Sequence, residues 1–281
     1  MPRYSALVPT LRRLLASVGI TAILLTAVGC SLLDGLEDTR GPLHGASAEL
    51  DDDLGGMDVY EVDDVGGLIP EATGLAADVW DMFLRVATPE YAADRILWYQ
   101  VGDDPDSDLL AWVAEADDPD YWELAVNLDG AQDEGMLLLT LIHEYAHLFS
   151  MSGGQTDMVG ECETRHAAEP CAEEGGYLST FYDRFWLRYG DDAPSFSEPD
   201  QDVIDAFLEA NEDDFLSGYA ATDVGEDFAE TFTVFVAEPR PDDPAASLTA
   251  EKLAFMWEYP ELVEIRGRLR AEFGDITWAE Y

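Results

Sequence analysis

The feature that most constrains this chain is the pentapeptide His143-Glu144-Tyr145-Ala146-His147, which follows the apolar run from Met136 to Ile142. The run predicts a helix, and residues four apart on a helix share one face. Both imidazoles can therefore reach one metal ion, while Glu144 would stand beside the open coordination position of that ion. This arrangement is typical of zinc hydrolases. The alternative is a pair of helix histidines whose polar atoms are satisfied by neighbouring carboxylates.

A zinc site with an open position needs a third protein ligand from elsewhere in the chain. The metzincin pattern would place its glycine and third histidine at Ser150 and Gly153, so this class is excluded. His166 lies between Cys162 and Cys171, where a disulfide is the simpler explanation of the cysteines. Carboxylates are therefore the better candidates for the third ligand.

One acidic segment has the spacing that such a ligand requires. A helix is predicted from Glu226 to about Val236, with Gly225 before it, acids in its first turn and Pro239 beyond its end. Glu226 and Glu230 are four residues apart and share a face of this helix. One of them can bind zinc while the other accepts a hydrogen bond from a ligating imidazole.

Together the two motifs resemble a known family. H-E-x-x-H at residues 143–147, followed by Y-x6-E-x-F-A-E-x-F at residues 219–232, is similar to the catalytic domain of anthrax lethal factor and to the Pro-Pro endopeptidases, which are gluzincins. The likeness covers about twenty residues. Tyr145-Ala146 and Asp227 depart from the family pattern at positions that are not ligands, so substrate preference is not carried over.

The resemblance implies a role for each matching residue. Glu226 would be the third zinc ligand beside His143 and His147, and Tyr219 would donate a hydrogen bond to the oxyanion. Glu230 would correspond to a glutamate that supports the ligands without binding the metal. A partly buried aromatic residue with a satisfied hydroxyl is the alternative reading of Tyr219.

The chemistry expected of these residues is that of a zinc-dependent endopeptidase with one catalytic Zn²⁺. A metal-activated water would attack the peptide bond, with Glu144 as general base and Tyr219 as the oxyanion donor. A first alternative is a catalytically silent surface protein of zincin fold that binds zinc or a protein partner. A second is a structural domain whose histidines bind no metal.

The N-terminus predicts export from the cytoplasm. Three arginines stand within the first thirteen residues, and an uncharged apolar stretch from Leu14 to Gly29 leads to Cys30. Residues 1–29 therefore resemble a lipoprotein signal peptide, with Cys30 as the lipidated residue. Ala27 replaces the usual leucine, so an ordinary cleaved signal remains the alternative. The stretch is shorter than the roughly 20 residues of a membrane span.

The remaining cysteines agree with an extracytoplasmic location, either as a cell-surface or periplasmic lipoprotein or as a secreted protein. Once Cys30 carries a lipid, Cys162 and Cys171 form an even pair, and we expect a disulfide between them. Free thiols, or a second zinc site with His166, are the alternatives.

The charge of the chain limits its partners. Fourteen basic residues stand against 60 acidic ones, which gives a formal net charge of −46. Such an excess favours solubility in high salt and disfavours nucleic acid and anionic membranes as partners. We expect a monomer that acts on a peptide or protein and meets a membrane only through the lipid at Cys30.

The sequence predicts an acidic flexible tether over residues 30–67 and one catalytic domain over residues 68–281. The fold class is α+β and zincin-like, with a small mixed sheet and the active-site helix in an upper lobe and a helical lower lobe. The strand from Trp122 to Leu128 is the candidate for docking an extended peptide, the alternative being an ordinary sheet edge. The other predicted elements are strands at 95–101 and 110–114 and helices at 75–86, 176–187, 201–210, 226–236, 250–258 and 261–273.

Overall fold

The computed structural model describes residues 56–107, 109–118, 120–152, 155–157, 171–194 and 201–278, all of which belong to the unit His44–Tyr281. The predictions for the signal peptide, for Cys30 and for Cys162 lie outside the described residues. The predicted disulfide does so too, because only the backbone of Cys171 is described.

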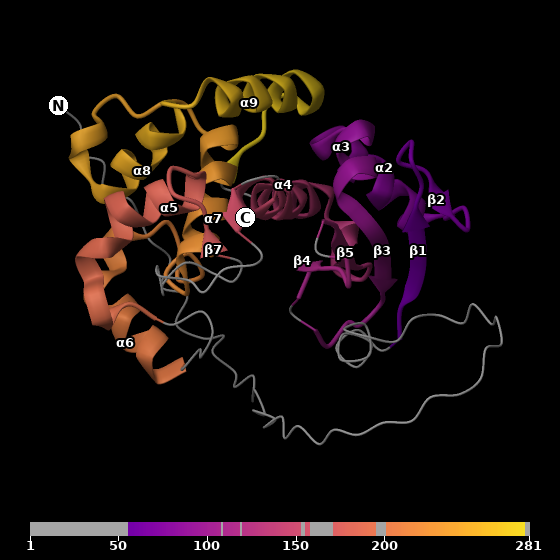
Figure 1. Ribbon diagram of the computed structural model, residues 1–281, viewed down its shortest axis with the longest axis horizontal. Coiled ribbons are helices and arrows are strands. Elements are labelled where there is room, and N and C mark those ends of the chain that lie inside the picture. The colour runs from indigo at the N-terminus through magenta and orange to yellow at the C-terminus, as the bar shows by residue number, and fades with distance from the viewer. Residues whose placement is uncertain are drawn as a thin grey trace. The chain divides into compact units, whose positions relative to one another are not determined.

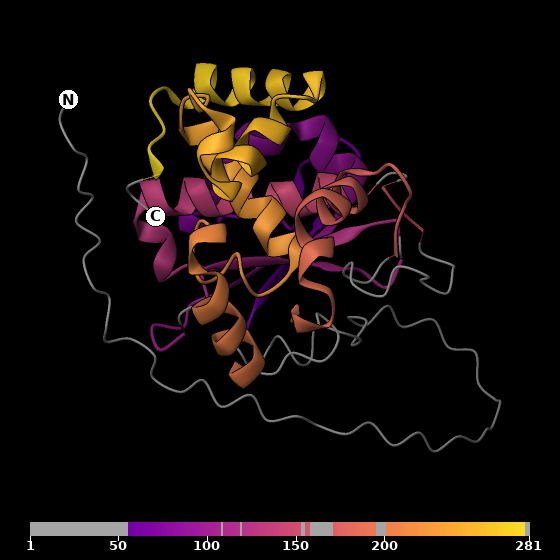
Figure 2. The same cartoon turned by 90° about the vertical axis from the view of Figure 1, so that its left-hand side faces the viewer.

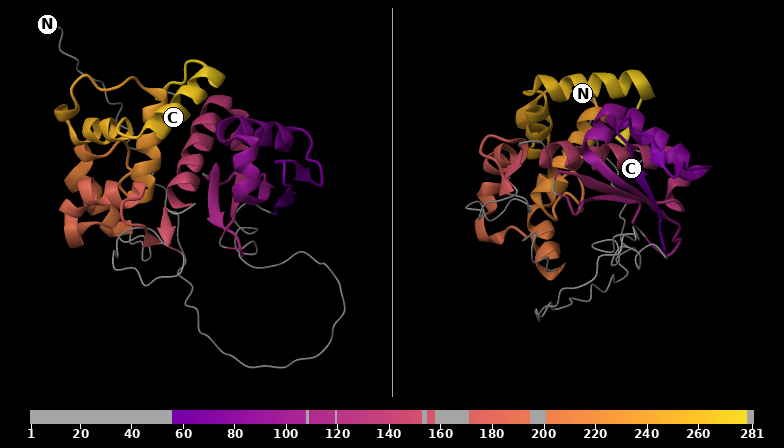
Figure 3. Two further views of the ribbon diagram at one scale, coloured as in Figure 1. Left: turned by 45° about the horizontal axis from the view of Figure 1, so that its top comes forward. Right: turned by 45° about the vertical axis from the view of Figure 1, so that its right-hand side comes forward.

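A five-stranded mixed sheet forms one side of the molecule, and its strand order is β2-β1-β3-β5-β4. Strands β3 and β5 are parallel, and the other neighbours are antiparallel. Helices α2 and α4 cover one face (Figures 1 and 3), where Tyr99 and Leu124 are fully buried. The strands are β1 (Asp58–Val62), β2 (Leu68–Ile69), β3 (Ile96–Gly102), β4 (Ala111–Glu115) and β5 (Trp122–Asn127).

The prediction of a flexible tether as far as residue 67 is wrong for the part that the structure describes. Strand β1 pairs with β3, and the ring of Tyr60 stacks on that of Tyr99 with centroids 5.8 Å apart. Of the residues of β1, only Tyr60 and Val62 turn away from solvent. Two such residues are enough to form the strand, because a strand with one covered face needs an apolar residue only at every second position. The acidic residues of β1, Asp58 and Glu61, hid this alternation.

The prediction that residues 122–128 form the exposed docking edge is also wrong. Strand β5 lies between β3 and β4, and all six of its residues are buried. Strand β4 forms the edge of the sheet beside α4 (Figure 1). Two strands joined by a short turn look alike in sequence, and their pattern does not show which one pairs with β3.

Helices gather on the other side of α4 from the sheet (Figures 1 and 2), and the predicted α+β class is confirmed. The predicted helix at 176–187 is a short α5 that passes into a π-helical turn (Tyr182–Trp186) and then a 3-10 segment (Leu187–Asp192). No helix in the described ranges is both long and apolar enough to cross a membrane. The helices are α2 (Leu75–Ala87), α3 (Pro89–Arg95), α4 (Glu134–Met151), α5 (Tyr177–Phe181), α6 (Gln201–Asn211), α7 (Val224–Ala237), α8 (Leu248–Met256) and α9 (Pro260–Phe273), and the short elements are 3-10 turns at Gly130–Gln132, Glu212–Asp214 and Pro244–Ala246 and strands β6 (Thr156–Asp157) and β7 (Cys171–Ala172).

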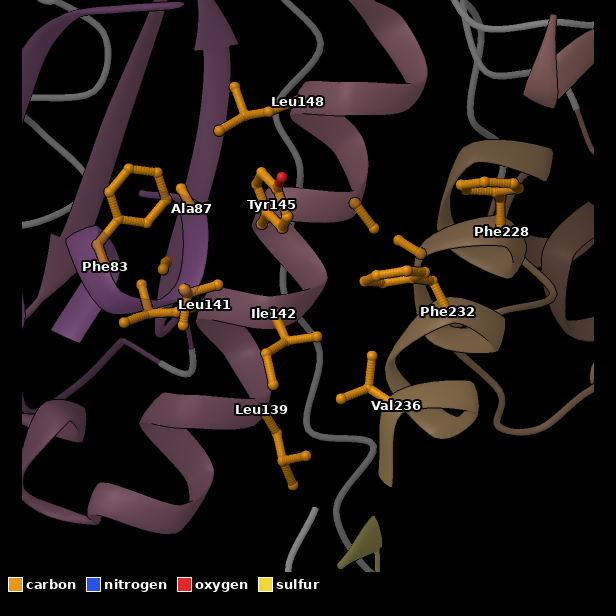
Figure 4. Packing of buried hydrophobic residues seen from close by; sticks show 14 of the residues in the cluster. Phe83, Ala87, Leu139, Leu141, Ile142, Tyr145, Leu148, Phe228, Phe232 and Val236 are labelled. Carbon is orange, nitrogen blue, oxygen red and sulfur yellow. The ribbon is translucent and has the colours of Figure 1, made fainter. Parts of the chain in front are cut away.

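Helix α4 is buried on two sides. Figure 4 shows Phe83 of α2 on one side of it and Phe228 and Phe232 of α7 on the other. Asp133 caps its first turn by accepting hydrogen bonds from the backbone N–H groups of Gly135 and Met136. A helix enclosed in this way can carry polar side chains only where a neighbouring element provides partners for them.

Helix α9 holds the helices on both sides of α4 through arginine side chains. Arg268 donates hydrogen bonds to the carbonyl oxygens of Arg85 and Val86 at the end of α2. Arg266 and Arg270 donate to the carbonyl oxygens of residues 235–238 at the end of α7. A cation at a helix C-terminus satisfies the last carbonyls and opposes the helix dipole, so α9 fixes α2 and α7 together.

Candidate metal centre

Helices α4 and α7 bring two imidazoles and one carboxylate to a single point. His143 Nε2 lies 2.9 Å from Glu226 Oε2 and 3.0 Å from His147 Nε2, and His147 Nε2 lies 3.3 Å from Glu226 Oε2. Within the described residues, this is the group of histidine, cysteine and acidic side chains that could hold a metal ion. The predicted ligand set is therefore assembled in space.

The separations of these atoms suit zinc. Zinc bonds of about 2.0–2.1 Å in a tetrahedral site place two ligand atoms about 3.3 Å apart. The three observed separations of 2.9–3.3 Å approach this value, and nitrogen and oxygen donors are those that Zn²⁺ accepts. Three protein ligands would leave a fourth position for a substrate or a water. The donor set fits a catalytic zinc site.

The three side chains strongly affect one another's pKa values. Burial lowers the pKa of His143. Burial also opposes a charge on His147, yet the carboxylates of Glu226, Glu144 and Asp223 outweigh it and raise the pKa of His147 to about 9. Burial likewise disfavours the charge of Glu226, but the two imidazoles hold its pKa well below the usual range. The site therefore places a positive charge against Glu226, and a bound cation would take the place of the proton on His147.

Glu144 lies beside this cluster without joining it. Its side chain is buried, and the backbone of Val113 on the edge strand β4 is close enough to favour its charged form. Burial raises the pKa of Glu144 to about 8, with a further contribution from the charge of Glu226. A divalent cation in the site would lower that value toward the range in which a carboxylate can take up and release a proton at neutral pH.

Tyr219 closes the site from the segment that precedes α7. Its ring centroid is 5.9 Å from that of His143, and its hydroxyl is close enough to Glu226 to feel the charge of that carboxylate. The residue is 52% exposed, so its ring is partly buried, which both readings of Tyr219 allow. Burial of its hydroxyl, together with the charges of Glu226 and Glu144, raises its pKa, so the phenol stays protonated as a hydrogen-bond donor.

The expected hydrogen bond between Glu230 and a ligating imidazole is not formed. Glu230 accepts a hydrogen bond from Ser217 Oγ at 2.8 Å, and neither histidine Nδ1 has a partner among the described residues. The same Ser217 oxygen accepts from the backbone N–H of Tyr219 at 2.9 Å. Glu230 therefore supports the segment that carries Tyr219 and makes no hydrogen bond to either imidazole.

The sequence analysis also missed the residue that begins the ligand helix. Asp223 Oδ1 accepts hydrogen bonds from the backbone N–H of Gly225 at 2.7 Å and of Glu226 at 3.0 Å. A Cβ atom on Gly225 would lie 3.0 Å from Asp223 Oδ1 and 4.0 Å from His147 Nδ1, so glycine allows these groups to come close. The pattern Asp-x-x-Glu was a signal for this cap, because it is the spacing of a helix N-terminus.

The chain matches no protein-family model, and comparison with curated proteins and with solved structures likewise gives no match. The function therefore has to be argued from the geometry of the site.

Replacing Asp223 tests whether it organises the first turn of α7. Asp223→Ala removes both capping hydrogen bonds and should lower the free energy of unfolding by about 1 kcal/mol. Asp223→Asn keeps the size and a capping oxygen, and should lose less than half of that. Urea unfolding followed by circular dichroism measures the difference. Equal losses in the two variants would show that the charge of Asp223 matters and its capping does not.

Proposed function

We propose that this protein is a zinc-dependent endopeptidase of zincin-like fold, with His143, His147 and Glu226 as the metal ligands. The observation that carries the proposal is the convergence of these three donor atoms beside Glu144, which follows His143 on the same helix. A Zn²⁺ ion held there would supply a Lewis acid for the scissile carbonyl and would lower the pKa of the attacking water. The division into a mixed sheet and a helical half, with α4 between them, supports the zincin-like assignment.

Glu144 and Tyr219 then each have a role in the reaction that is consistent with their surroundings. Glu144 takes a proton from the attacking water and returns it to the leaving amine, because it is buried next to the ligands and has a raised proton affinity. Tyr219 donates its hydroxyl hydrogen bond to the carbonyl oxygen as negative charge develops there. Its exposed ring leaves that side of the site open to a substrate.

The edge strand β4 is suited to hold an extended peptide. The backbone N–H of Asn127 donates to Leu110 O, so Ala111 and Val126 form a pair without mutual hydrogen bonds in this antiparallel ladder. By alternation, the N–H and C=O groups of Ala111 and Val113 turn away from β5.

This outward-facing edge passes Glu144, since the backbone of Val113 is close enough to favour the charged form of that carboxylate. We infer that a substrate pairs with β4 as an added strand, which carries its scissile bond past Glu144. Strand β4 thus takes the docking role that the sequence analysis gave to residues 122–128.

Metal analysis of matched variants tests the central proposal. The wild-type protein in high salt should hold one zinc per chain and cleave members of a mixed peptide library. Glu144→Gln should keep zinc and lose about 10²–10⁴-fold in turnover, because only the general base is removed. Glu226→Ala should lose zinc to a chelator at much lower concentration than the wild type, because a ligand is removed.

Each contrary result has a definite meaning. Equal zinc retention in Glu226→Ala and Glu144→Gln would place the third ligand elsewhere. Stoichiometric zinc without cleavage of any peptide would favour the zinc-binding surface protein over the enzyme. Wild-type protein that takes up no zinc would refute the proposal.

Tyr219→Phe tests the oxyanion role. Loss of one positioned donor should lower kcat by about 10²–10³-fold while zinc content stays at one per chain. Tyr177→Phe is the matched control, because it removes an exposed hydroxyl that hydrogen-bonds to Glu261 away from the site. Steady-state kinetics that show the same kcat for both variants would remove Tyr219 from the mechanism.

Methylation of substrate nitrogens tests docking on β4 without any change in the protein. In a cleaved peptide, each backbone nitrogen is methylated in turn and kcat/KM is measured. Only alternate residues of an added strand face β4, so losses of about 2–10-fold should recur at every second nitrogen. Losses without this period would rule out pairing with the edge strand.

A further inference from the structure

Lys252 is the single lysine of the chain, and it lies fully buried in α8. Its Nζ atom is 2.7 Å from Asp227 Oδ2 and donates to the carbonyl oxygen of Asp214 at 2.8 Å. It also lies 4.0 Å from the centre of the Phe215 ring. Asp227 is fully buried too, and its Oδ2 accepts a second hydrogen bond from Trp186 Nε1 at 2.7 Å.

Stability alone does not explain this ion pair. Removing two charges from water is so unfavourable that well-packed apolar residues in place of a buried pair often give an equal or higher stability. The arginines in the described part of the chain all keep some contact with solvent, so Lys252 is the exception among the basic residues there. Buried pairs are best attested as devices that select one arrangement of the elements they join.

The elements joined by Lys252 are those that form the site. Asp227 directly follows the ligand Glu226 in the first turn of α7. Adjacent residues on a helix point about 100° apart, so Asp227 enters the helical half while Glu226 faces the histidines of α4. With Asp227 held by Lys252 and Trp186, α7 cannot rotate about its axis without breaking a buried ion pair.

The second contact of Lys252 acts on the other half of the site. Asp214 immediately precedes the segment from Phe215 to Asp223, which carries Ser217 and Tyr219. Phe215 packs against Trp186 with ring centroids 5.5 Å apart, so the start of this segment is anchored to the group that also binds Asp227. One ammonium group therefore fixes the ligand helix and the beginning of the Tyr219 segment relative to each other.

We propose that Lys252 is a positioning residue, which sets Glu226 and Tyr219 at the separation that the metal site requires. This inference rests on the proposed zinc peptidase function. It assigns a purpose to Asp227, one of the positions at which the chain departs from the family that its motifs resemble.

The decisive experiment replaces the ion pair by neutral groups. The double variant Asp227→Asn with Lys252→Met keeps an acceptor for Trp186 and leaves no buried charge. Its metal-free form should unfold within a few degrees of the wild-type midpoint, whereas its zinc affinity, measured by chelator competition, should fall about 10–100-fold. The absorption bands of Co²⁺ bound in place of zinc should shift, because the placement of Glu226 has changed.

Two further variants keep the test sharp. Lys252→Met alone covers the case in which the double variant does not fold, because the remaining carboxyl group of Asp227 can take up a proton and keep its hydrogen bond to Trp186. It should also bind zinc less tightly than the wild type. Arg184→Gln is the control, because it breaks ion pairs to Glu251 and Glu258 on the exposed side of the same region. That variant should bind zinc as the wild type does.

The outcomes separate the two proposals. If a folded pair variant binds zinc with wild-type affinity and an unchanged Co²⁺ spectrum, Lys252 is structural only and the inference is overturned. If the wild-type protein itself binds no zinc, the proposed function fails first.

Discussion

The contact between α4 and α7 is the interaction on which the rest of the structure depends. Helix α4 is enclosed between the sheet side and α7, yet it carries two histidines and a glutamate that are all buried. Such groups are tolerable only where each finds a partner of suitable charge. Glu226 provides that partner for both imidazoles, and His147 is the charged neighbour that favours the carboxylate of Glu144. The same pairing that makes a polar central helix acceptable therefore also assembles the candidate metal site.

The large acidic excess makes the few cations informative. In the described part of the chain, the main hydrogen bonds of the three arginines of α9 are not to carboxylates. They donate to the final carbonyl oxygens of α2 and α7, where a guanidinium can satisfy two acceptors at once. Lys252 acts near the other end of α7, at Asp227. Basic groups thus hold both ends of α7, the helix that places Glu226 beside the histidines of α4.

Much of this arrangement could be predicted from the sequence, and the failures have physical reasons. The spacing of His143 and His147 indicates a shared face on any helix, so that part of the site needs no tertiary information. Assigning Glu226 to the same cluster required a resemblance, because nothing local shows that α7 meets α4. The Asp-x-x-Glu cap at Asp223 was readable but passed unnoticed among many acids. The exchange of β5 for β4 at the sheet edge, and the inclusion of β1, depend on strand pairings that alternation alone does not reveal.

Glu226 and Glu230 show most clearly what tertiary structure adds. Both lie on one face of α7, and the sequence treats them as nearly equivalent. They are four residues apart, about 6 Å along the axis, and that distance separates two environments. The first turn meets the histidines, whereas the second meets Ser217, whose hydroxyl also binds the backbone of Tyr219 and Ala220. One glutamate is thereby committed to the imidazoles and the other to the segment that carries Tyr219, so two parts of the candidate site are fixed by adjacent turns of a single helix.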